Sequence, residues 1–177
     1  ANATLTLIDE NVQSVPKTKR FDLVAISCLT GTAFKAYEWS RHFRSQGATV
    51  VLGGYHVTLR PEEAMEHADT VMTGFAELAW PQLIQDFKSG TLKPRYEGGQ
   101  GDVNLLPPPR RDLQKRFGYA MPNAVSATRA CKCHCAFCSI PAAKLRWQMR
   151  PLPEVIDEIR AMPGRRFTFN DVNLLQD

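Results

Sequence analysis

A chain of 177 residues has room for one ordinary domain, or for a small domain and part of another. Its 44% hydrophobic and 23% charged residues are typical of a soluble globular protein and exclude a disordered chain. No apolar run reaches the roughly 18–20 residues of a membrane span. The first residues also lack the basic start and apolar stretch of a secretory signal, so we expect a cytoplasmic protein without a membrane span.

The net charge of +4 is mild. Its one dense patch comprises Arg110, Arg111, Lys115 and Arg116, and it is interrupted by Asp112. Because no interleaved aromatic repeats, zinc fingers or helix-turn-helix signals accompany this patch, it indicates a solvated linker rather than a phosphate-binding surface. We expect no nucleic-acid partner.

The first half of the chain alternates predicted strands and helices. Strands are predicted at 4–8, 21–27, 48–52 and 70–73, and helices at 33–46, 61–67 and 78–88. The second of these strands is β-branched and almost wholly apolar, as buried parallel strands are. The alternation predicts an α/β fold with a parallel sheet covered by helices on both faces.

Polar and glycine-containing loops follow three of these strands, and ligands of such sheets lie beyond the carboxyl ends of the strands. The candidate binding residues in these loops are Thr30, Gly53, Gly54, His56, Gly74 and Glu77. Glycine permits tight turns and a close approach of the backbone to a ligand. Each glycine alone is explained equally well by a strand-to-helix turn, but the three loops together favour a site.

The chain changes character near residue 90. Glycines at 98–101 and prolines at 107–109 indicate a linker, after which a strand at 125–128, a cysteine-rich loop, a helix at 153–162 and a strand at 166–171 are predicted. Strand, loop, helix and strand alone leave a sheet edge uncovered. We therefore expect a truncated chain with a domain over 1–95, a linker over 96–123 and the start of a second domain over 124–177.

Four of the five cysteines fall between Cys131 and Cys138, whereas Cys28 stands alone. Thiols this crowded cannot all pair as disulfides without strain, and a reducing cytosol does not keep such bonds, so they are interpreted as metal ligands. A structural zinc site is one alternative, although zinc ligands usually come as two separated pairs. A redox dithiol of Cys135 and Cys138 is another. The third interpretation takes Cys131, Cys135 and Cys138 as a Cys-x-x-x-Cys-x-x-Cys triplet that binds three irons of a 4Fe–4S cluster and leaves the fourth iron open.

This triplet, with Phe137 just before its last cysteine and a strand before its first, resembles the signature of the radical S-adenosylmethionine superfamily. The resemblance implies that the open iron binds S-adenosylmethionine and that electron transfer from the cluster yields a 5′-deoxyadenosyl radical. It implies an electron donor such as flavodoxin or ferredoxin. Phe137 would line the adenine side of the site, or would pack under the loop. The pattern does not require Cys133, and His134 is interpreted as a solvent-facing loop residue.

The stretch 51–64 resembles the Gly-Gly-x-His-x-Thr-x-x-Pro-Glu segment of cobalamin-binding domains fused to radical S-adenosylmethionine enzymes, and 7–10, 67–77 and 80–83 continue the match. That class includes anaerobic magnesium-protoporphyrin ester cyclases and methylases of unactivated carbon or phosphorus. The resemblance implies a Rossmann-like cobalamin-binding domain, with its first strand missing, followed by the start of a radical S-adenosylmethionine (β/α) partial barrel. The six loop residues of the sheet edge would then contact cobalamin.

The sequence departs from the family pattern at several positions. Ala130 stands where the family usually has glycine, Phe75 and Ala76 replace a Glu-Gly pair, and Val172 breaks an acidic pair beside Asp171. No histidine has an aspartate two residues before it and a glycine three after it, so the resemblance implies no protein histidine below cobalt. His56 would lie near the corrin or its tail, or would cap its loop.

A methylthiotransferase is a rival within the superfamily, but it needs three further cysteines upstream, and only Cys28 precedes Cys131. The resemblance therefore implies an enzyme in which the radical abstracts hydrogen from an unactivated bond of a small-molecule substrate. Cobalamin would then deliver a methyl group or assist oxidation. The alternative from another class is a non-catalytic cobalamin- or zinc-binding module. We expect the isolated fragment to be inactive.

Overall fold

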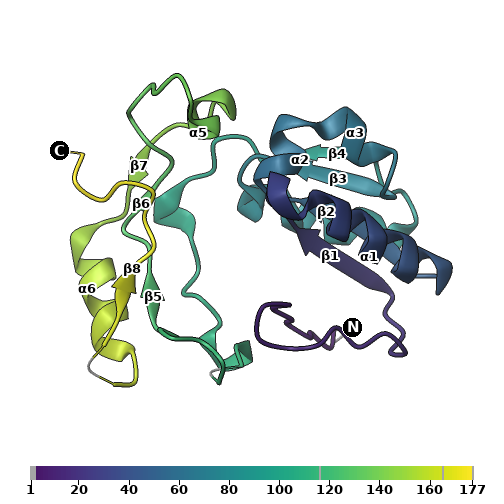
Figure 1. The fold of residues 1–177 in the computed structure, drawn as a ribbon, viewed down its shortest axis with the longest axis horizontal. Coiled ribbons are helices and arrows are strands. Elements are labelled where there is room, and N and C mark those ends of the chain that lie inside the picture. The colour runs from purple at the N-terminus through teal and green to yellow at the C-terminus, as the bar shows by residue number, and fades with distance from the viewer. Residues whose placement is uncertain (1–2, 116, 165, 177) are drawn as a thin grey trace. The chain divides into compact units, whose positions relative to one another are not determined.

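The computed structural model describes residues 3–115, 117–164 and 166–176, and the chain divides into two compact units (Figure 1). The sheet unit comprises residues 20–101 and 132–146, and the second unit comprises residues 1–19, 102–131 and 147–177. These ranges differ from the expected 1–95, 96–123 and 124–177. Residues 95–97 belong to the sheet, and both the N-terminal segment and most of the expected linker cluster with the residues from 147 onward.

The sheet unit contains four parallel strands, which confirms the expected α/β class. They are β1 (Leu23–Ser27), β2 (Thr49–Gly53), β3 (Thr70–Thr73) and β4 (Arg95–Glu97), in the order β1-β2-β3-β4. The pairing places Ile26 opposite Leu52, Leu52 opposite Val71, and Met72 opposite Tyr96. The fourth strand was not predicted from the sequence, because only Tyr96 of its three residues is buried.

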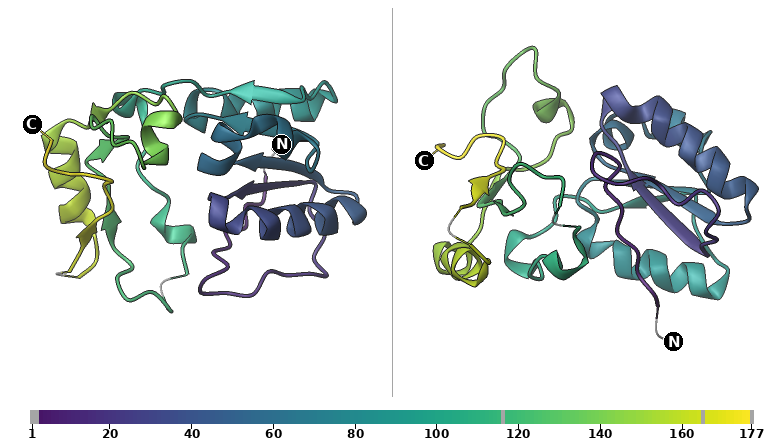
Figure 2. Two further views of the ribbon diagram at one scale, coloured as in Figure 1. Left: turned by 45° about the horizontal axis from the view of Figure 1, so that its top comes forward. Right: turned by 60° about the horizontal axis from the view of Figure 1, so that its bottom comes forward.

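Helices cover both faces of this sheet (Figure 2). They are α1 (Ala33–Ser45), α2 (Tyr55–Leu59), α3 (Pro61–Met65) and α4 (Trp80–Ser89), with short 3-10 turns at Thr30–Thr32 and Ala76–Leu78. On one face, Leu83 of α4 packs with Val51, Met72 and Tyr96. Val50 and Leu52 alternate with Val51 along β2 and are fully buried on the other face, because successive side chains of a strand point to opposite sides.

The second unit contains the expected strand, helix and strand, whereas most of the loop between the first strand and the helix, residues 132–146, belongs to the sheet unit. Strand β5 (Ala124–Val125) pairs in parallel with β8 (Thr168–Phe169), and α6 (Leu152–Ala161) lies between them in the chain. Val125, Val155 and Met162 form its core. The strand expected at 125–128 is divided, because a separate β6 (Thr128–Arg129) pairs antiparallel with β7 (Gln148–Met149). Further short helices lie at Val103–Leu105, Arg111–Leu113 and, in the sheet unit, Ser139–Ala142 (α5).

The strand predicted at residues 4–8 is wrong. This segment has no strand conformation, and the side chains of Leu5 and Leu7 are 68% and 52% exposed. The Leu7 carbonyl accepts a hydrogen bond from the Gln13 side chain at 3.0 Å instead of from a neighbouring strand. Alternation of apolar residues predicts a strand only where a sheet covers the apolar face, and none covers it here. Among the described residues, no helix has both the length and the apolar character needed to cross a membrane.

Candidate functional site

The carboxyl edge of the sheet brings together the loops after β1, β2 and β3. Thr58 connects two of these loops, because its hydroxyl donates to the Gly54 carbonyl at 2.9 Å and accepts from the Gly74 amide at 3.0 Å. The loop after β1 joins them through the amide of His56, which donates to the Cys28 carbonyl at 3.3 Å. The predicted glycine loops therefore form one hydrogen-bonded edge. Thr58 was not singled out from the sequence, although it lies within the family-like segment.

Gly54 is required by the backbone. Its φ of +96° lies in the left-handed region, and a Cβ atom there would lie 2.6 Å from the Cys28 carbonyl oxygen. Gly74 has a φ of +73°, and its Cβ would lie 2.6 Å from the carbonyl oxygen of Gly99. Both glycines thus allow neighbouring loops to touch through their backbones. This supports the turn interpretation for each glycine, and it also shapes the edge at which a cofactor would lie.

His56 is buried, and both of its ring nitrogens have partners. Its Nε2 lies 2.9 Å from the Tyr37 hydroxyl, and its Nδ1 lies 3.3 Å from the Thr30 hydroxyl. The Tyr37 hydroxyl also donates to Glu63 at 3.1 Å. In this arrangement neither nitrogen of His56 is available to a metal, and the ring connects α1 to the loop after β1.

The charges around this histidine shift the pKa values of its neighbours. Burial and the hydrogen bond to Glu63 raise the pKa of Tyr37 to about 12. Desolvation by itself would raise the pKa of Glu63, but hydrogen bonds from Tyr37 and Arg60 and the nearby His56 outweigh it and hold that pKa below its usual value. Burial raises the pKa of the Cys28 thiol, so Cys28 is held as a neutral core residue.

A cavity of about 340 Å³ opens at this edge within the sheet unit. Its lining comprises Leu29, Thr30, Tyr55, Leu59, Ser139 and Ile140. Of the predicted contact residues, Thr30 lines this cavity, and Gly54 directly precedes the helix that carries Tyr55. Leu29 and Phe34, which lie close together in the chain, are 60% and 83% exposed. The edge therefore combines apolar surface with a few polar groups, as small-molecule and cofactor sites do. Glu77 is half-buried in the 3-10 turn after β3.

The cysteine loop, residues 130–147 between β6 and β7, carries the predicted ligands. Cys135 is exposed, Cys131 and Cys138 are half-buried, and none of the five cysteines forms a disulfide. A turn joins two of the ligands, since the Cys138 amide donates to the Cys135 carbonyl at 3.0 Å. Phe137 is 94% exposed, so it does not pack under the loop. Across the described part of the chain, no three His, Cys, Asp or Glu side chains converge as a metal site.

The backbone before Cys131 has a conformation that favours glycine. Ala130 has a φ of +59° and is buried. A left-handed conformation is easiest for glycine and costs an L-residue roughly 1–2 kcal/mol. Ala130 thus adopts this conformation at the cost of backbone strain.

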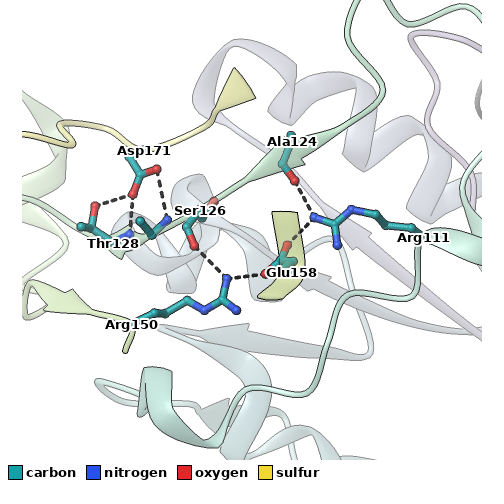
Figure 3. Close-up of polar contacts among 8 residues, drawn as sticks. Arg111, Ala124, Ser126, Thr128, Arg150, Glu158 and Asp171 are labelled. Atoms are coloured by element: carbon teal, nitrogen blue, oxygen red, sulfur yellow. Dashed lines mark hydrogen bonds and ion pairs between the residues drawn. The ribbon is translucent and has the colours of Figure 1, made fainter. Parts of the chain in front are cut away.

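The two ends of the cysteine loop lie in the second unit, where side-chain hydrogen bonds and ion pairs hold the chain around them. Figure 3 shows the Asp171 carboxylate facing Thr128, and Glu158 between the guanidinium groups of Arg111 and Arg150. Two of the arginines in the expected basic patch are therefore in ion pairs, Arg111 with Glu158 and Arg110 with Asp112. Arg116, also in that patch, lies outside the described residues.

The N-terminal part of the chain is similar to a known family. Residues 3–84 match the family model described as the B12 binding domain. A parallel α/β sheet with its binding loops at the carboxyl edge is consistent with a Rossmann-like domain of this kind.

The chain is also homologous to methyltransferases. It is 34% identical to the bacteriochlorophyllide d C-8(2)-methyltransferase of Chlorobaculum tepidum over 68% of this chain and 28% of that protein. It is 29% identical to the C-12(1)-methyltransferase of the same organism over 96% of this chain and 40% of that protein. An uncharacterized methyltransferase of Pyrococcus horikoshii is 28% identical over 90% of this chain and 40% of that protein.

The chain thus spans 28–40% of the length of these relatives. A solved structure, the N-terminal domain of a hypothetical protein of Thermotoga maritima, is 26% identical and covers 55% of this chain and 78% of its own, with a TM-score of 0.41.

Proposed function

We propose that this protein is a cobalamin-dependent radical S-adenosylmethionine methyltransferase. The observation that carries the proposal is the presence, in one chain, of a B12-type domain and of the Cys131, Cys135 and Cys138 triplet outside any disulfide. The methyltransferase names of the relatives favour methylation over oxidative cyclisation.

The carboxyl edge suits cobalamin on two structural grounds. Gly54 and Gly74 allow close backbone contact between neighbouring loops at this edge, and Leu29 and Phe34 offer exposed apolar surface for a macrocycle. The hydroxyl of Thr30, which lines the cavity, lies 3.3 Å from Nδ1 of His56. Because the nitrogens of His56 are engaged by Tyr37 and Thr30, we propose that cobalamin binds without a protein histidine below cobalt.

The cysteine loop suits an iron–sulfur cluster by the chemistry of its donors. Three thiols at this spacing match the three-cysteine ligation of a cluster with one open iron, whereas thiolates of structural zinc sites usually come in separated pairs. When bound, such a cluster supplies the electron that cleaves S-adenosylmethionine. We assign Phe137, which is almost fully exposed, to contact with S-adenosylmethionine. The electron would come from a donor such as flavodoxin or ferredoxin, and the methyl acceptor would be a small-molecule substrate.

Cobalamin binding is tested with the full chain and hydroxocobalamin. We expect the two to co-elute in gel filtration. The spectrum of the bound cobalamin should not change when His56 is replaced by phenylalanine in a variant that stays folded. Leu29→Glu, at an exposed apolar position of the cavity, should weaken binding, and Leu105→Glu, at an exposed position in the second unit, should not. Failure of hydroxocobalamin to bind at all would contradict the cobalamin part of the proposal.

The cluster is tested by anaerobic reconstitution with iron and sulfide. The expected result is about four irons per chain and charge-transfer absorption that are lost in Cys135→Ala and kept in Cys133→Ala, the matched control from the same loop. Tight zinc binding with no iron uptake would support the alternative, a non-catalytic cobalamin- or zinc-binding module.

A further inference from the structure

The strand that leads into the cysteine loop is held by one acidic side chain. Asp171 accepts hydrogen bonds from the Ala127 amide at 3.2 Å, from the Thr128 hydroxyl at 2.6 Å, and from the Thr128 amide. Figure 3 shows the Asp171 carboxylate facing Thr128. Thr128 is buried, and only two residues separate it from the predicted ligand Cys131. The carboxylate therefore fixes the backbone immediately before the loop.

Asp171 continues a ladder of hydrogen bonds that the backbone cannot complete. Strand β8 pairs with β5 through Phe169 opposite Val125, and the Asn170 amide still donates to the Val125 carbonyl at 2.8 Å. At the next residue, the side-chain carboxylate of Asp171 accepts the hydrogen bond of the Ala127 amide, in place of a backbone carbonyl. Bonds from amides and hydroxyls to an ionised carboxylate are stronger than bonds between neutral groups, so this contact adds charge-assisted bonds at the start of the loop.

The other side of the segment 124–128 is held by arginines. The Arg150 guanidinium donates to the Ser126 carbonyl at 3.0 Å and to Glu158 at 2.6 Å, and Arg111 donates to the Ala124 carbonyl at 2.6 Å and to Glu158. The Arg150 amide also donates to the Ala127 carbonyl at 2.8 Å. The Val125 carbonyl and the amides at 127 and 128 are bonded to β8 and Asp171, and the carbonyls of Ala124, Ser126 and Ala127 are bonded to the arginines. Bonds on both sides leave the segment 124–128 little freedom to rotate.

We propose that Asp171 is a positioning residue that sets the orientation of Cys131 as a metal ligand, acting through Thr128. The inference rests on the proposed function only in taking Cys131 as a ligand. Both carboxylate oxygens accept from the chain itself, so Asp171 acts through the backbone of the loop and not by contact with substrate. Only a carboxylate can accept hydrogen bonds at both positions, because the side chain of asparagine would turn its NH₂ group toward a backbone donor.

The decisive variant is Asp171→Asn, studied first in the metal-free chain by amide hydrogen exchange. We expect exchange at Ala127 and Thr128 to accelerate by on the order of tenfold, because a charge-assisted acceptor is lost. Exchange in α1 of the sheet unit should not change. Thr128→Val removes only the hydroxyl donor and should give a smaller acceleration, on the order of threefold. If Asp171→Asn fails to fold, the Thr128→Val variant still tests the contact between Asp171 and Thr128.

The second arm measures iron and sulfide uptake and the electron paramagnetic resonance spectrum of the reduced chain. Asp171→Asn should lower uptake and change the spectrum of the cluster that forms. Val155→Ala, a core substitution in the same unit, should lower stability and leave that spectrum as in wild type. A Val155→Ala spectrum that changes in the same way would overturn a specific role for Asp171.

The two proposals fail in different ways. If the wild-type chain takes up no iron, the proposed function fails, and the exchange measurement alone decides whether Asp171 fixes the strand before Cys131. If wild type binds the cluster but Asp171→Asn leaves both exchange and spectrum unchanged, the role of Asp171 is refuted and the proposed function stands.

Discussion

Glu158 offers the sharpest test of how the second unit is held together. Its side chain is 9% exposed and pairs with Arg111 and Arg150, whose side chains are 21% and 14% exposed. Glu158→Ala would leave two largely buried guanidinium groups without a counter-charge. Removing one partner of a buried ion pair typically costs about 3–5 kcal/mol. Because each arginine keeps a backbone carbonyl as acceptor, we take a lower value of about 2–3 kcal/mol for this site.

The measurement is thermal unfolding followed by circular dichroism, with hydrogen exchange in α6 to localise the effect. For a domain of 60–100 residues, 1 kcal/mol corresponds to about 4–8 °C, so we expect the melting temperature of this unit to fall by on the order of 10 °C or more. The matched control is Asp157→Ala on the same helix. Asp157 pairs with Arg160, both side chains are about three-quarters exposed, and such a pair contributes about 0.2–1 kcal/mol at most.

Two results would refute this reasoning. One is equal melting temperatures for the Glu158→Ala and Asp157→Ala variants, which would mean that burial of the pair adds nothing. The other is disappearance of the Glu158→Ala effect in about 1 M salt, where the screening length falls to about 3 Å. An effect that is lost in salt belongs to exposed charges, whereas a buried pair is screened much less.

Three further predictions concern single positions. Tyr37 should ionise with a pKa of about 12, so the stability that it contributes is complete below pH 10 and is lost as the pH rises toward 12. An ultraviolet phenol titration should show this step in wild type but not in Tyr37→Phe; a midpoint near 10 would contradict burial as the cause. Gly54→Ala should cost more than about 2 kcal/mol, because of its positive φ and its backbone contacts, while Gly31→Ala, where nothing lies within 4 Å, should be near neutral in urea unfolding. Similar midpoints for these two variants would disprove the close contact. Ala130→Gly should leave stability within about 1 kcal/mol of wild type, because relief of roughly 1–2 kcal/mol of strain is offset by glycine's chain entropy and the lost methyl group. Ala130→Val should lose about 2–3 kcal/mol, and a stable valine variant would argue against the left-handed conformation.

The strands β1, β2 and β3 could be predicted from the sequence because each is a run of apolar or β-branched residues between turn signals. Their carboxyl ends then placed Thr30, Gly54 and Gly74 at one edge without further information. Strand β4 carried no comparable signal, since its stability comes from pairing with β3 and from the packing of Tyr96. The segment 4–8 carried a strand signal, but it pairs with no strand among the described residues.

The partners of the candidate site were harder to predict. His56 was recognised as a site residue, but its contacts with Tyr37 and Glu63 arise only when α1 and α3 pack on the same face of the sheet. Asp171 was noted only as half of a broken acidic pair. Its bonds to residues 43 and 44 positions earlier in the chain depend on the parallel pairing of β5 with β8, and no local pattern encodes that pairing.

The pairing of β6 with β7 closes the cysteine loop at its base. Thr128 lies opposite Met149 and Arg129 opposite Gln148, so both ends of the loop are fixed by the same two-residue ladder. The entropic cost of closing a loop grows only with the logarithm of its length, by about 0.6 kcal/mol for each doubling. A change in the length of this loop would therefore cost little in closure entropy as long as the β6–β7 pair at its base is kept.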